Sequence, residues 1–337
     1  MGHGSKGAVY SAIFANGVLT VIKFGAFAVS GSAALLSEGI HSLADCSNQS
    51  LLALGLKKSE RPADEGHPYG YSSELFIWAL ISAVGIFFLG CGLSVYHGVQ
   101  AMMHPHPLEN STLSIGVLLF SAAVEAIPLY MAIKAVRTSA SETGLSFSGY
   151  IREGPDPMGV AVLLEDAAAE VGVFIALGCL FAAQATGDPR WDALASILIG
   201  LLLGLVAIFL IRRNKSMLTG QSLQPHHRAL ADQVLTDDPV VESFQDVKTT
   251  VLGPQTFRFK AEVDFDGRMV ARRYLESLSE SERQEFQRAL GDEAGRQAAL
   301  EDFGEHLVTA LAMEIDRIEE KMRDKIPELR HVDLEAD

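Results

Sequence analysis

Six long apolar segments follow one another in the larger, N-terminal part of the chain. They cover residues 9–30, 33–56, 74–99, 112–135, 159–184 and 190–212. An α-helix needs about 20 mostly apolar residues to cross the hydrocarbon core of a bilayer, and each segment supplies them. The pattern therefore predicts an all-α membrane region of six transmembrane helices over residues 1–212.

Polar connections separate these segments. The stretch 136–158 is expected to form a longer polar loop, whereas the connections after the first, third and fifth segments are short. Neither a basic leader with a cleavage site nor an Arg- and Ser-rich transit peptide precedes the first segment, so we expect it to stay in the mature protein. Gly85, Gly90 and Gly92 are expected to let the third segment pack closely against a neighbour.

Residues 213–337 have a different pattern, which predicts a separate α+β domain. It predicts in order a helix, two strands, a helix and a strand, at residues 226–236, 243–252, 256–265, 303–325 and 329–336. A Gly-Pro turn at 253–254 joins the first two strands as a hairpin. The charged stretch 267–302 interrupts this order as an insert of solvated helix, and we interpret it as either a surface hairpin or a contact for a partner or a second copy.

Charged residues are concentrated in this second part. It has 17 Lys and Arg against 26 Asp and Glu, whereas residues 1–212 have 10 against 16. A hydrophobic membrane region followed by a charged soluble domain accounts for the distribution. The net charge of −15 argues against a nucleic-acid partner, since binding a polyanion needs clustered Lys and Arg. Cations are the natural cargo.

The basic residues of the loops predict the orientation in the membrane. One side of the predicted bundle collects Lys6, Lys57, Lys58, Arg61, Lys134, Arg137, Arg152, Arg212, Arg213 and Lys215. The other side has only Arg190. Since cytoplasmic loops carry the excess of Lys and Arg, both termini and the charged domain are expected in the cytoplasm.

Ionisable residues lie within the second apolar segment. A charge at the centre of a bilayer costs about 3 kcal/mol even on lenient insertion scales, so such residues mark functional sites by default. Glu38, His41 and Asp45 are spaced to share one helical face. His41 and Asp45 form an HxxxD pair one turn apart, which can bind a divalent ion side by side.

The fifth segment has a second acidic pair. Asp166 and Glu170 lie one turn apart, so two helices that each present such a pair could enclose one ion. Glu165 points about 100° away from Asp166 on a helix, which favours a supporting or structural role for it. A lone membrane His is usually a satisfied hydrogen-bonding group, and Glu125 and Lys23 could simply pair with a neighbour; the second acidic pair favours the metal site.

Several strings of the sequence resemble the cation diffusion facilitator family, and most of all its zinc transporter nine branch. In the membrane part they are SAALLSEGIHSLADCSNQSLLALG, HPYGYSSELF, GIFFLGCGLSVYHGV, EGPDPMGVAVLLEDAAAEVGV and DPRWDALASILIG. In the soluble part they are DVKTTVLGPQTFRFKAEVDFDGRMVARRYL and RHVDLE. The resemblance runs over nearly the whole chain. It implies six-helix metal/proton antiport, with a cytoplasmic ferredoxin-like domain used for dimerisation.

The resemblance also implies a ligand set. The family's transport site uses two pairs of ligands one turn apart on the second and fifth helices, and His41, Asp45 and Asp166 match three of the four positions. The fourth position falls on Val162, which cannot bind a metal. Water, Glu170 or Glu125 could replace it. A site of one His with carboxylates suits Zn²⁺ but is oxygen-rich enough to leave Mn²⁺, Fe²⁺ or Co²⁺ open.

Two further family sites are matched incompletely. Asp64 and His67 match two positions of a loop site whose third position is Tyr71 here, which favours a structural loop or a transient binding point. His306, His331 and Asp333 match positions that bind metal between protomers in some relatives, while another of those positions falls on Ala261 and the domain has no Cys. Ordinary helix-face and strand-end roles are the simpler interpretation for these three residues.

These observations predict a secondary active transporter that exports a divalent cation, Zn²⁺ first, from the cytoplasm in exchange for protons. Nothing resembles a Walker A loop or a nucleophile–base pair, so no enzyme and no organic cofactor is expected. We expect a homodimer in the bilayer, and the inner membrane of a bacterium as its location. The alternative is a membrane-anchored metal sensor or interaction protein without net transport.

Overall fold

The computed structural model describes residues 3–105, 111–142, 144–153, 157–253 and 256–337. The chain divides into two compact units, Met1–Thr219 and Gly220–Asp337. The division lies slightly beyond the boundary expected after residue 212, because the last helix of the first unit continues to Leu218.

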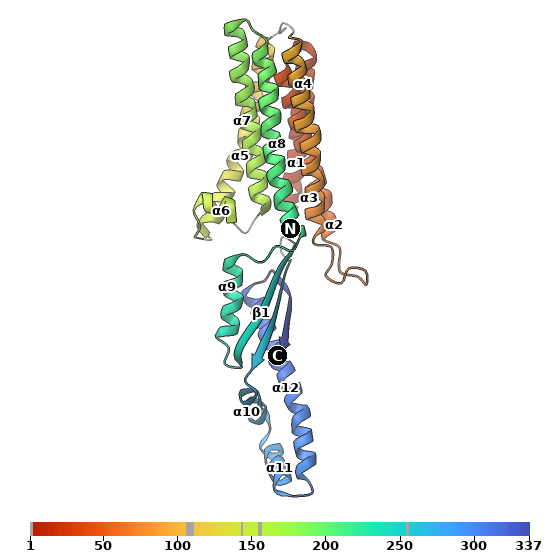
Figure 1. Cartoon of the computed structure of the whole chain (residues 1–337), viewed down its shortest axis with the longest axis vertical. Coiled ribbons are helices and arrows are strands. Elements are labelled where there is room, and N and C mark those ends of the chain that lie inside the picture. Colours follow the sequence, from red (N-terminus) through yellow and green to blue (C-terminus); the bar gives the residue numbers. More distant parts are fainter. Residues whose placement is uncertain (1–2, 106–110, 143, 154–156, 254–255) are drawn as a thin grey trace. The chain divides into compact units, whose positions relative to one another are not determined.

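Long helices make up the described part of the first unit and lie side by side (Figure 1). They are α1 (His3–Ser30), α2 (Ala33–Ser59), α3 (Glu74–Gly85), η1 (Ile86–Cys91), α4 (Gly92–Met103), α5 (Ser111–Glu142), α6 (Phe147–Glu153), α7 (Pro157–Thr186) and α8 (Arg190–Leu218). The segments α3, η1 and α4 follow without a break and form one span, so the prediction of a helical membrane region is confirmed.

Four spans are long and apolar enough to cross a membrane by length and composition. They are Glu74–Met103, Ser111–Ser141, Val162–Thr186 and Arg190–Leu218. The apolar part of α1 found among the described residues, Asn16–Ser30, is shorter. Helix α2 does not reach this apolarity, because the polar residues that define the candidate site interrupt its apolar sequence. Its Glu38, His41 and Ser42 are buried against neighbouring helices.

The structure differs from the sequence expectation at two places in this unit. The stretch 136–158, expected as a polar loop, is helical over much of its length, because α5 continues to Glu142 and α6 follows at Phe147–Glu153. Tyr150 of α6 is buried in an apolar cluster with Val136, Ala140, Val160 and Leu163. That burial stabilises a short helix which composition alone did not indicate. The third span also contains the π-helical segment η1.

Of the three glycines expected to pack closely, Gly90 meets a neighbouring helix, because a Cβ atom there would lie 3.4 Å from Leu203 of α8. The tighter contacts occur at other glycines. A Cβ atom at Gly98 of α4 would lie 2.9 Å from the backbone nitrogen of Ile197 in α8. At Gly200 it would lie 2.8 Å from Val95, and at Gly204 2.9 Å from Cys91. At Gly85 and Gly92, which the sequence favoured, it would meet no other described atom within 4 Å outside its own helix backbone. Small residues on α8 therefore set the contact with η1 and α4.

The second unit is a three-stranded sheet with helices. Its elements are α9 (Pro225–Thr236), β1 (Val241–Gly253), β2 (Thr256–Phe265), α10 (Gly267–Ser277), α11 (Glu280–Gly291), α12 (Arg296–Lys325) and β3 (Leu329–Ala336). The strand order is β1-β2-β3, with β1 antiparallel and β3 parallel to β2. This confirms the expected α+β domain after the membrane region. The turn expected at 253–254 lies partly outside the described residues.

One face of the sheet forms the core of this unit. Alternate residues of β2 are buried, among them Phe259, Ala261 and Val263. They pack in one apolar cluster with Val234 of α9 and Ile318 of α12. The period-two alternation of β2 thus places its apolar side chains on the face of the sheet that packs against α9 and α12.

The insert at 267–302 forms α10, α11 and the beginning of a long α12, which starts earlier than the expected residue 303. Both short helices contact α12 (Figure 1). Stacked aromatic rings contribute to this contact, with Phe286 against Phe303 at 5.5 Å between ring centroids. No residue of α11 is buried, as expected for solvated helix.

Candidate metal site between helices α2 and α7

Helix α2 presents the first half of the candidate site. Glu38, His41 and Asp45 follow one another along its inward face, and Glu38 and His41 are buried. The His41 Nε2 atom lies 3.6 Å from the Asp45 Oδ2 atom, one turn further along. This spacing lets the imidazole and the carboxylate approach a single ion from the same helix.

The N-terminal end of α2 is fixed by a carboxylate from another helix. Asp192 of α8 accepts hydrogen bonds from the Ser32 hydroxyl at 2.6 Å and from the backbone N–H groups of Ala33 and Ala34. The Ser32 hydroxyl in turn accepts from the backbone N–H of Leu35. Because the first N–H groups of a helix have no partner within it, this contact positions α2 against α8.

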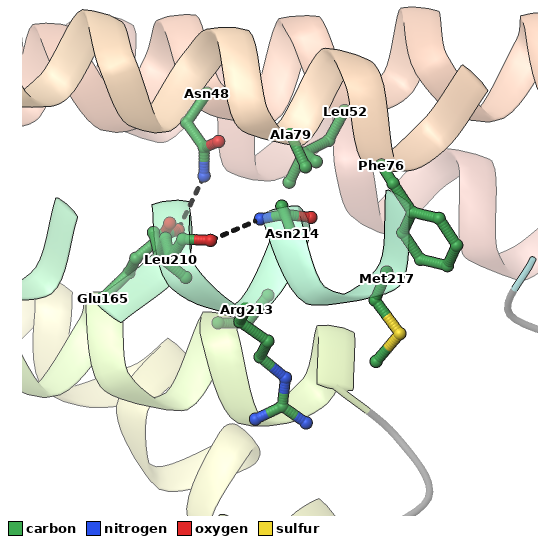
Figure 2. A pocket seen from close by; sticks show the side chains of 10 residues that line it. Asn48, Leu52, Phe76, Ala79, Glu165, Leu210, Arg213, Asn214 and Met217 are labelled. Atoms are coloured by element: carbon green, nitrogen blue, oxygen red, sulfur yellow. Dashed lines mark hydrogen bonds between the residues drawn. The ribbon is translucent and has the colours of Figure 1, made fainter. Parts of the chain in front are cut away.

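Helix α7 presents Glu165, Asp166 and Glu170 toward α2. Asp45 interacts electrostatically with both Glu165 and Asp166. Glu165 has a defined partner, since its Oε2 atom accepts a hydrogen bond from the Asn48 side chain at 2.6 Å (Figure 2). The Asn48 amide oxygen accepts from Ser82 of α3 at 2.7 Å. Glu165 is thus tied to α2 and α3 through Asn48.

A small pocket adjoins this hydrogen-bonded group. It is lined by Asn48, Leu52, Phe76, Ala79, Val162, Glu165, Leu210, Arg213, Asn214 and Met217 (Figure 2). Its volume of about 30 Å³ is enough for one or two water molecules. Val162, which stands at a family ligand position, lines this pocket and is 42% exposed. A water molecule in this pocket would lie beside the position that lacks a ligand.

Helices α2 and α7 approach closely at Gly172. A Cβ atom there would lie 2.7 Å from the Glu38 Oε1 atom and 3.7 Å from the His41 Nδ1 atom. Both of these buried atoms have no hydrogen-bond partner among the described residues. Gly172 therefore leaves the space into which two unpaired polar atoms of α2 point.

Lys23 of α1 lies at the far end of the same polar group. Its Nζ atom is 2.9 Å from the Glu38 Oε2 atom and 2.8 Å from the Glu125 Oε1 atom. All three side chains are almost completely buried. The ammonium therefore joins α1, α2 and α5 through two ion pairs, and Glu125, one candidate for the fourth ligand, is already paired.

Four carboxylate and imidazole atoms in this region are buried without a hydrogen-bond partner in the part of the chain that the structure describes. They are Glu38 Oε1, His41 Nδ1, Glu125 Oε2 and Glu170 Oε2. An unsatisfied buried polar atom usually costs about 1–3 kcal/mol. Their concentration on α2, α5 and α7 indicates a place prepared for a ligand that is positive or donates hydrogen bonds.

The predicted ligands are near one another but not gathered at coordination distance. Within the described ranges, no group of three or more His, Cys, Asp or Glu side chains is arranged to hold a metal ion. His41 and Asp45 are paired with each other on α2, whereas Asp166 and Glu170 belong to α7. Binding one ion through all four residues therefore requires these side chains to rearrange around it.

The loop after α2 is closed on itself. The Tyr71 hydroxyl donates to Asp64 at 2.7 Å, the backbone N–H of His67 donates to the same carboxylate at 2.8 Å, and the His67 ring lies 4.2 Å from that of Tyr71. The hydrogen bond from Tyr71 lowers the pKa of Asp64 below its usual value. These contacts favour the structural role for Asp64 and His67.

The three candidate residues of the second unit have separate partners. His306 stacks on Tyr274 of α10 at 5.5 Å and contacts the backbone oxygen of Asp302. Asp333 of β3 accepts from Arg258 of β2 at 2.9 Å. Burial lowers the pKa of His331 below its usual value, which favours the neutral imidazole. Within one chain they form no metal group with the other described residues.

Sequence reasoning missed four residues that shape the candidate site. Asn48 and Ser82 hold Glu165, Gly172 gives α7 its close approach to α2, and Asp192 caps α2. A buried Asn one turn from the HxxxD pair was a usable signal, because Asn48 continues the face of His41 and Asp45. The partners of Ser82, Gly172 and Asp192 lie far away in the sequence, so spacing gave no indication of them.

The fold and the site define a class of protein: a polytopic helical membrane protein with buried carboxylates and a His at its centre, followed by a small α/β domain. Comparison with known proteins gives the family. Residues 9–219 match the cation efflux transmembrane domain. The chain belongs to the cation efflux family, also called the cation diffusion facilitators.

Two plant and animal relatives are similar over almost the whole chain. Metal tolerance protein C4 of Arabidopsis thaliana is 42% identical over 98% of the chain and 73% of its own length. Proton-coupled zinc antiporter SLC30A9, mitochondrial, of Homo sapiens is 44% identical over 97% of the chain. The chain spans 58% of the length of this human relative.

A bacterial relative is more distant. Cation-efflux pump FieF of Shewanella oneidensis is 26% identical over 73% of the chain. The chain is an integral membrane protein, but the expected location in a bacterial inner membrane finds no support. The plant and animal relatives are far more similar than this bacterial one, and the human one has a mitochondrial name.

Proposed function

We propose that this protein is a secondary active transporter, and not an enzyme, that moves a divalent metal cation across the membrane in exchange for protons. The observation that carries the proposal is the set of buried, unpaired atoms of Glu38, His41, Glu125 and Glu170 within a helical bundle. Buried carboxylates without partners are costly. A cation that passes between α2 and α7 offsets this cost.

His41, Asp45, Asp166 and Glu170 are the proposed metal ligands. One imidazole with carboxylate oxygens suits Zn²⁺, and Mn²⁺, Fe²⁺ or Co²⁺ accept the same donors. Glu170 and Glu125 each keep one buried oxygen without a partner among the described residues. Glu170 is the better fourth ligand, because the other oxygen of Glu125 is held by the Lys23 ammonium. Zn²⁺ is favoured by the name of the human relative, a zinc antiporter.

Proton exchange follows from the chemistry of these ligands. Metal binding needs a neutral imidazole and ionised carboxylates, so it releases protons, and protons supplied from the other side eject the ion. The basic residues at the ends of α2 and α8 support a cytoplasmic position for that end, which makes the direction export. Rocking of the helices about the site would alternate access to the two sides.

Zinc uptake into proteoliposomes tests the site. Asp45→Ala and Asp166→Ala should each abolish uptake, because each removes a charged ligand of the ion. Glu60→Ala removes an exposed carboxylate at the end of α2 and serves as the matched control, which should transport like the wild type. If either ligand variant keeps wild-type uptake, the site assignment fails.

The fourth ligand has its own test. Glu170→Ala should reduce zinc uptake strongly if the Glu170 carboxylate binds the ion, and Glu170→Asp should restore part of it. Normal uptake by Glu170→Ala would assign the fourth position to water beside Val162 or to Glu125.

The alternative function is a membrane-anchored metal sensor. The observation that favours it is that the described residues include no preformed group of three ligands. A sensor would bind zinc without moving it, and binding would persist in His41→Ala through residues of the second unit such as His331. We further propose a homodimer, as the family resemblance implies, which light scattering in detergent measures directly.

A further inference from the structure

Lys23 is an almost completely buried charge of the candidate site. Its side chain is 1% exposed, and the side chains of Glu38 and Glu125 are 1% and 8% exposed. Each carboxylate offers one oxygen to the ammonium, at 2.9 Å and 2.8 Å. Since these partners come from α2 and α5, two charged hydrogen bonds hold the lysine to two helices of the bundle.

Each of the two carboxylates keeps one oxygen that this pairing does not involve. Glu38 Oε1 and Glu125 Oε2 are buried and have no hydrogen-bond partner among the described residues. One ammonium therefore faces two carboxyl groups, whose charges could also balance a doubly charged ion. Breaking a buried ion pair without a replacement is strongly destabilising, so any ion that replaces Lys23 must bring comparable charge.

The ammonium also acts on the neighbouring metal ligands. Its positive charge interacts electrostatically with His41, Asp45 and Glu170. The unpaired Glu38 Oε1 atom and His41 Nδ1 atom both face Gly172. The Glu38–Glu125 pair is therefore continuous with the proposed transport site through Glu38, and Lys23 lies between the two carboxylates.

We propose that Lys23 is a tethered cation, which occupies the Glu38–Glu125 carboxylates of a transient metal position and competes there with the transported ion. This inference rests on the proposed function. In the state that the structure describes, the ammonium fills the position, and an arriving divalent ion displaces it toward α1. Lys23 is a residue that sets affinity and does not itself bind metal.

A tether of this kind keeps binding reversible. Glu38, Glu125 and His41 without the ammonium would form an anionic, buried cage that holds a divalent ion firmly. An ion can be transported only if its binding is weak enough to release it. When the ammonium returns to the carboxylates, it lowers the affinity of this position and promotes release.

The experiment compares zinc affinity and zinc turnover in Lys23→Met and in the wild type, using the full chain and Zn²⁺ as the only metal. Affinity is measured by calorimetry in detergent at one fixed pH, and turnover is measured in proteoliposomes. Lys23→Arg keeps the charge, and Lys57→Met makes the same substitution at an exposed position of α2.

Lys23→Met should bind Zn²⁺ at least about tenfold more tightly, within the usual range of coupling between sites, and should turn over several-fold more slowly. Lys23→Arg and Lys57→Met should resemble the wild type in both measurements. Unchanged or weaker zinc binding by Lys23→Met would overturn the proposal, because a lysine that only stabilises the fold has no reason to oppose metal binding.

A second pair of variants covers the case in which Lys23→Met does not fold. Glu125→Gln removes one carboxylate, and Lys23→Met/Glu125→Gln then removes the ammonium without leaving two unpaired charges. The double variant should bind Zn²⁺ more tightly than Glu125→Gln, and equal affinity would refute the tether. If the wild type transports zinc but removal of the ammonium leaves zinc affinity unchanged, both in the wild type and in Glu125→Gln, the tether alone is contradicted. A wild type that binds zinc without transport contradicts the proposed function instead.

Discussion

Gly172 of α7 leaves no room for a side chain beside Glu38 of α2. A Cβ atom at this glycine would lie 2.7 Å from the Glu38 Oε1 atom, closer than two non-bonded atoms normally approach. The polar faces of α2 and α7 are thus in contact at this level, and the unpaired Glu38 oxygen is enclosed by the glycine. Movement of α7 relative to α2 would have to change this contact.

The first prediction follows from this contact. Gly172→Ala should displace the Glu38 carboxylate beside His41 and reduce zinc transport about tenfold or more, because misplacing groups by about 1 Å is costly at a site of fixed geometry. Proteoliposome uptake measures the effect. Gly178→Ala on the same helix is the control, since a Cβ there would meet no other described atom within 4 Å outside its helix backbone. Equal transport by the two variants would contradict the prediction.

A second prediction concerns the contact of α4 with α8. Gly98→Ala should destabilise the membrane unit by about 1–3 kcal/mol, as overpacking does, because the new Cβ would meet the backbone of α8. Thermal unfolding in detergent measures the change. Gly92→Ala should be neutral or stabilising, since Ala favours a helix by about 1 kcal/mol over Gly and the space is open. A stabilised Gly98→Ala would show that α4 and α8 are not packed as described.

The third prediction tests the cap that α8 supplies to α2. Asp192→Ala removes the acceptor for the Ser32 hydroxyl and for two backbone N–H groups, so we expect a loss of about 1–2 kcal/mol of stability. Denaturant unfolding followed by tryptophan fluorescence is suitable, because Trp191 is the adjacent residue. Asp188→Ala removes an exposed carboxylate nearby and should have a smaller effect. The same loss in both variants would exclude a specific role for the cap.

The fourth prediction is a pH dependence in the second unit. Asp238 is buried and accepts two hydrogen bonds from Arg317, at 2.9 Å and 2.8 Å. Burial alone would raise the pKa of Asp238, but hydrogen bonds from Arg317 and from the backbone of Val240 outweigh it, so the pKa lies below its usual value. An unfolded Asp has a pKa of about 3.9. The pairing therefore stabilises the fold above about pH 4, and this contribution is lost as the pH falls through the lower native pKa.

Asp238→Asn should cost about 2 kcal/mol at neutral pH, less than a fully buried pair because the Arg317 side chain is 39% exposed. It should also remove this part of the acid sensitivity. Amide hydrogen exchange within residues 220–337 of the full chain, corrected for the intrinsic pH dependence of exchange and compared between neutral and acid pH, measures both effects. Asp237→Asn changes the exposed neighbour and should behave like the wild type. An Asp238→Asn variant with wild-type acid sensitivity would refute the assignment.

The sequence predicted those parts of the fold that depend on local pattern. The apolar spans coincide with the long helices, and the alternation of Phe257, Phe259 and Ala261 predicted a half-buried strand. Helix α6 was missed because its stability comes from burial of Tyr150 among residues of α5 and α7, which composition does not reveal. The early start of α12 was missed because its first turns pack on the insert itself.

The candidate site shows the same limit. The two residues of the HxxxD pair lie one turn apart on α2, and the two residues of the acidic pair lie one turn apart on α7. Spacing alone therefore predicted which residues share a helix face. Spacing could not predict that Lys23 pairs with Glu125, which lies 102 residues away, or that Asp192 caps α2 across 160 residues. Such contacts depend on how helices pack. The pairing of Lys23, which the sequence left as a simple alternative, is the contact on which the tether rests.

The central claim is exchange of zinc for protons through His41, Asp45 and Asp166. The most direct measurement uses proteoliposomes that contain a pH-sensitive dye and have an imposed Zn²⁺ gradient but no pH gradient. We expect zinc to enter the wild-type vesicles while protons leave and the lumen becomes alkaline, and we expect neither change in Asp45→Ala vesicles. Zinc movement by the wild type without a change in lumenal pH, or an undiminished pH change in Asp45→Ala, would contradict this claim.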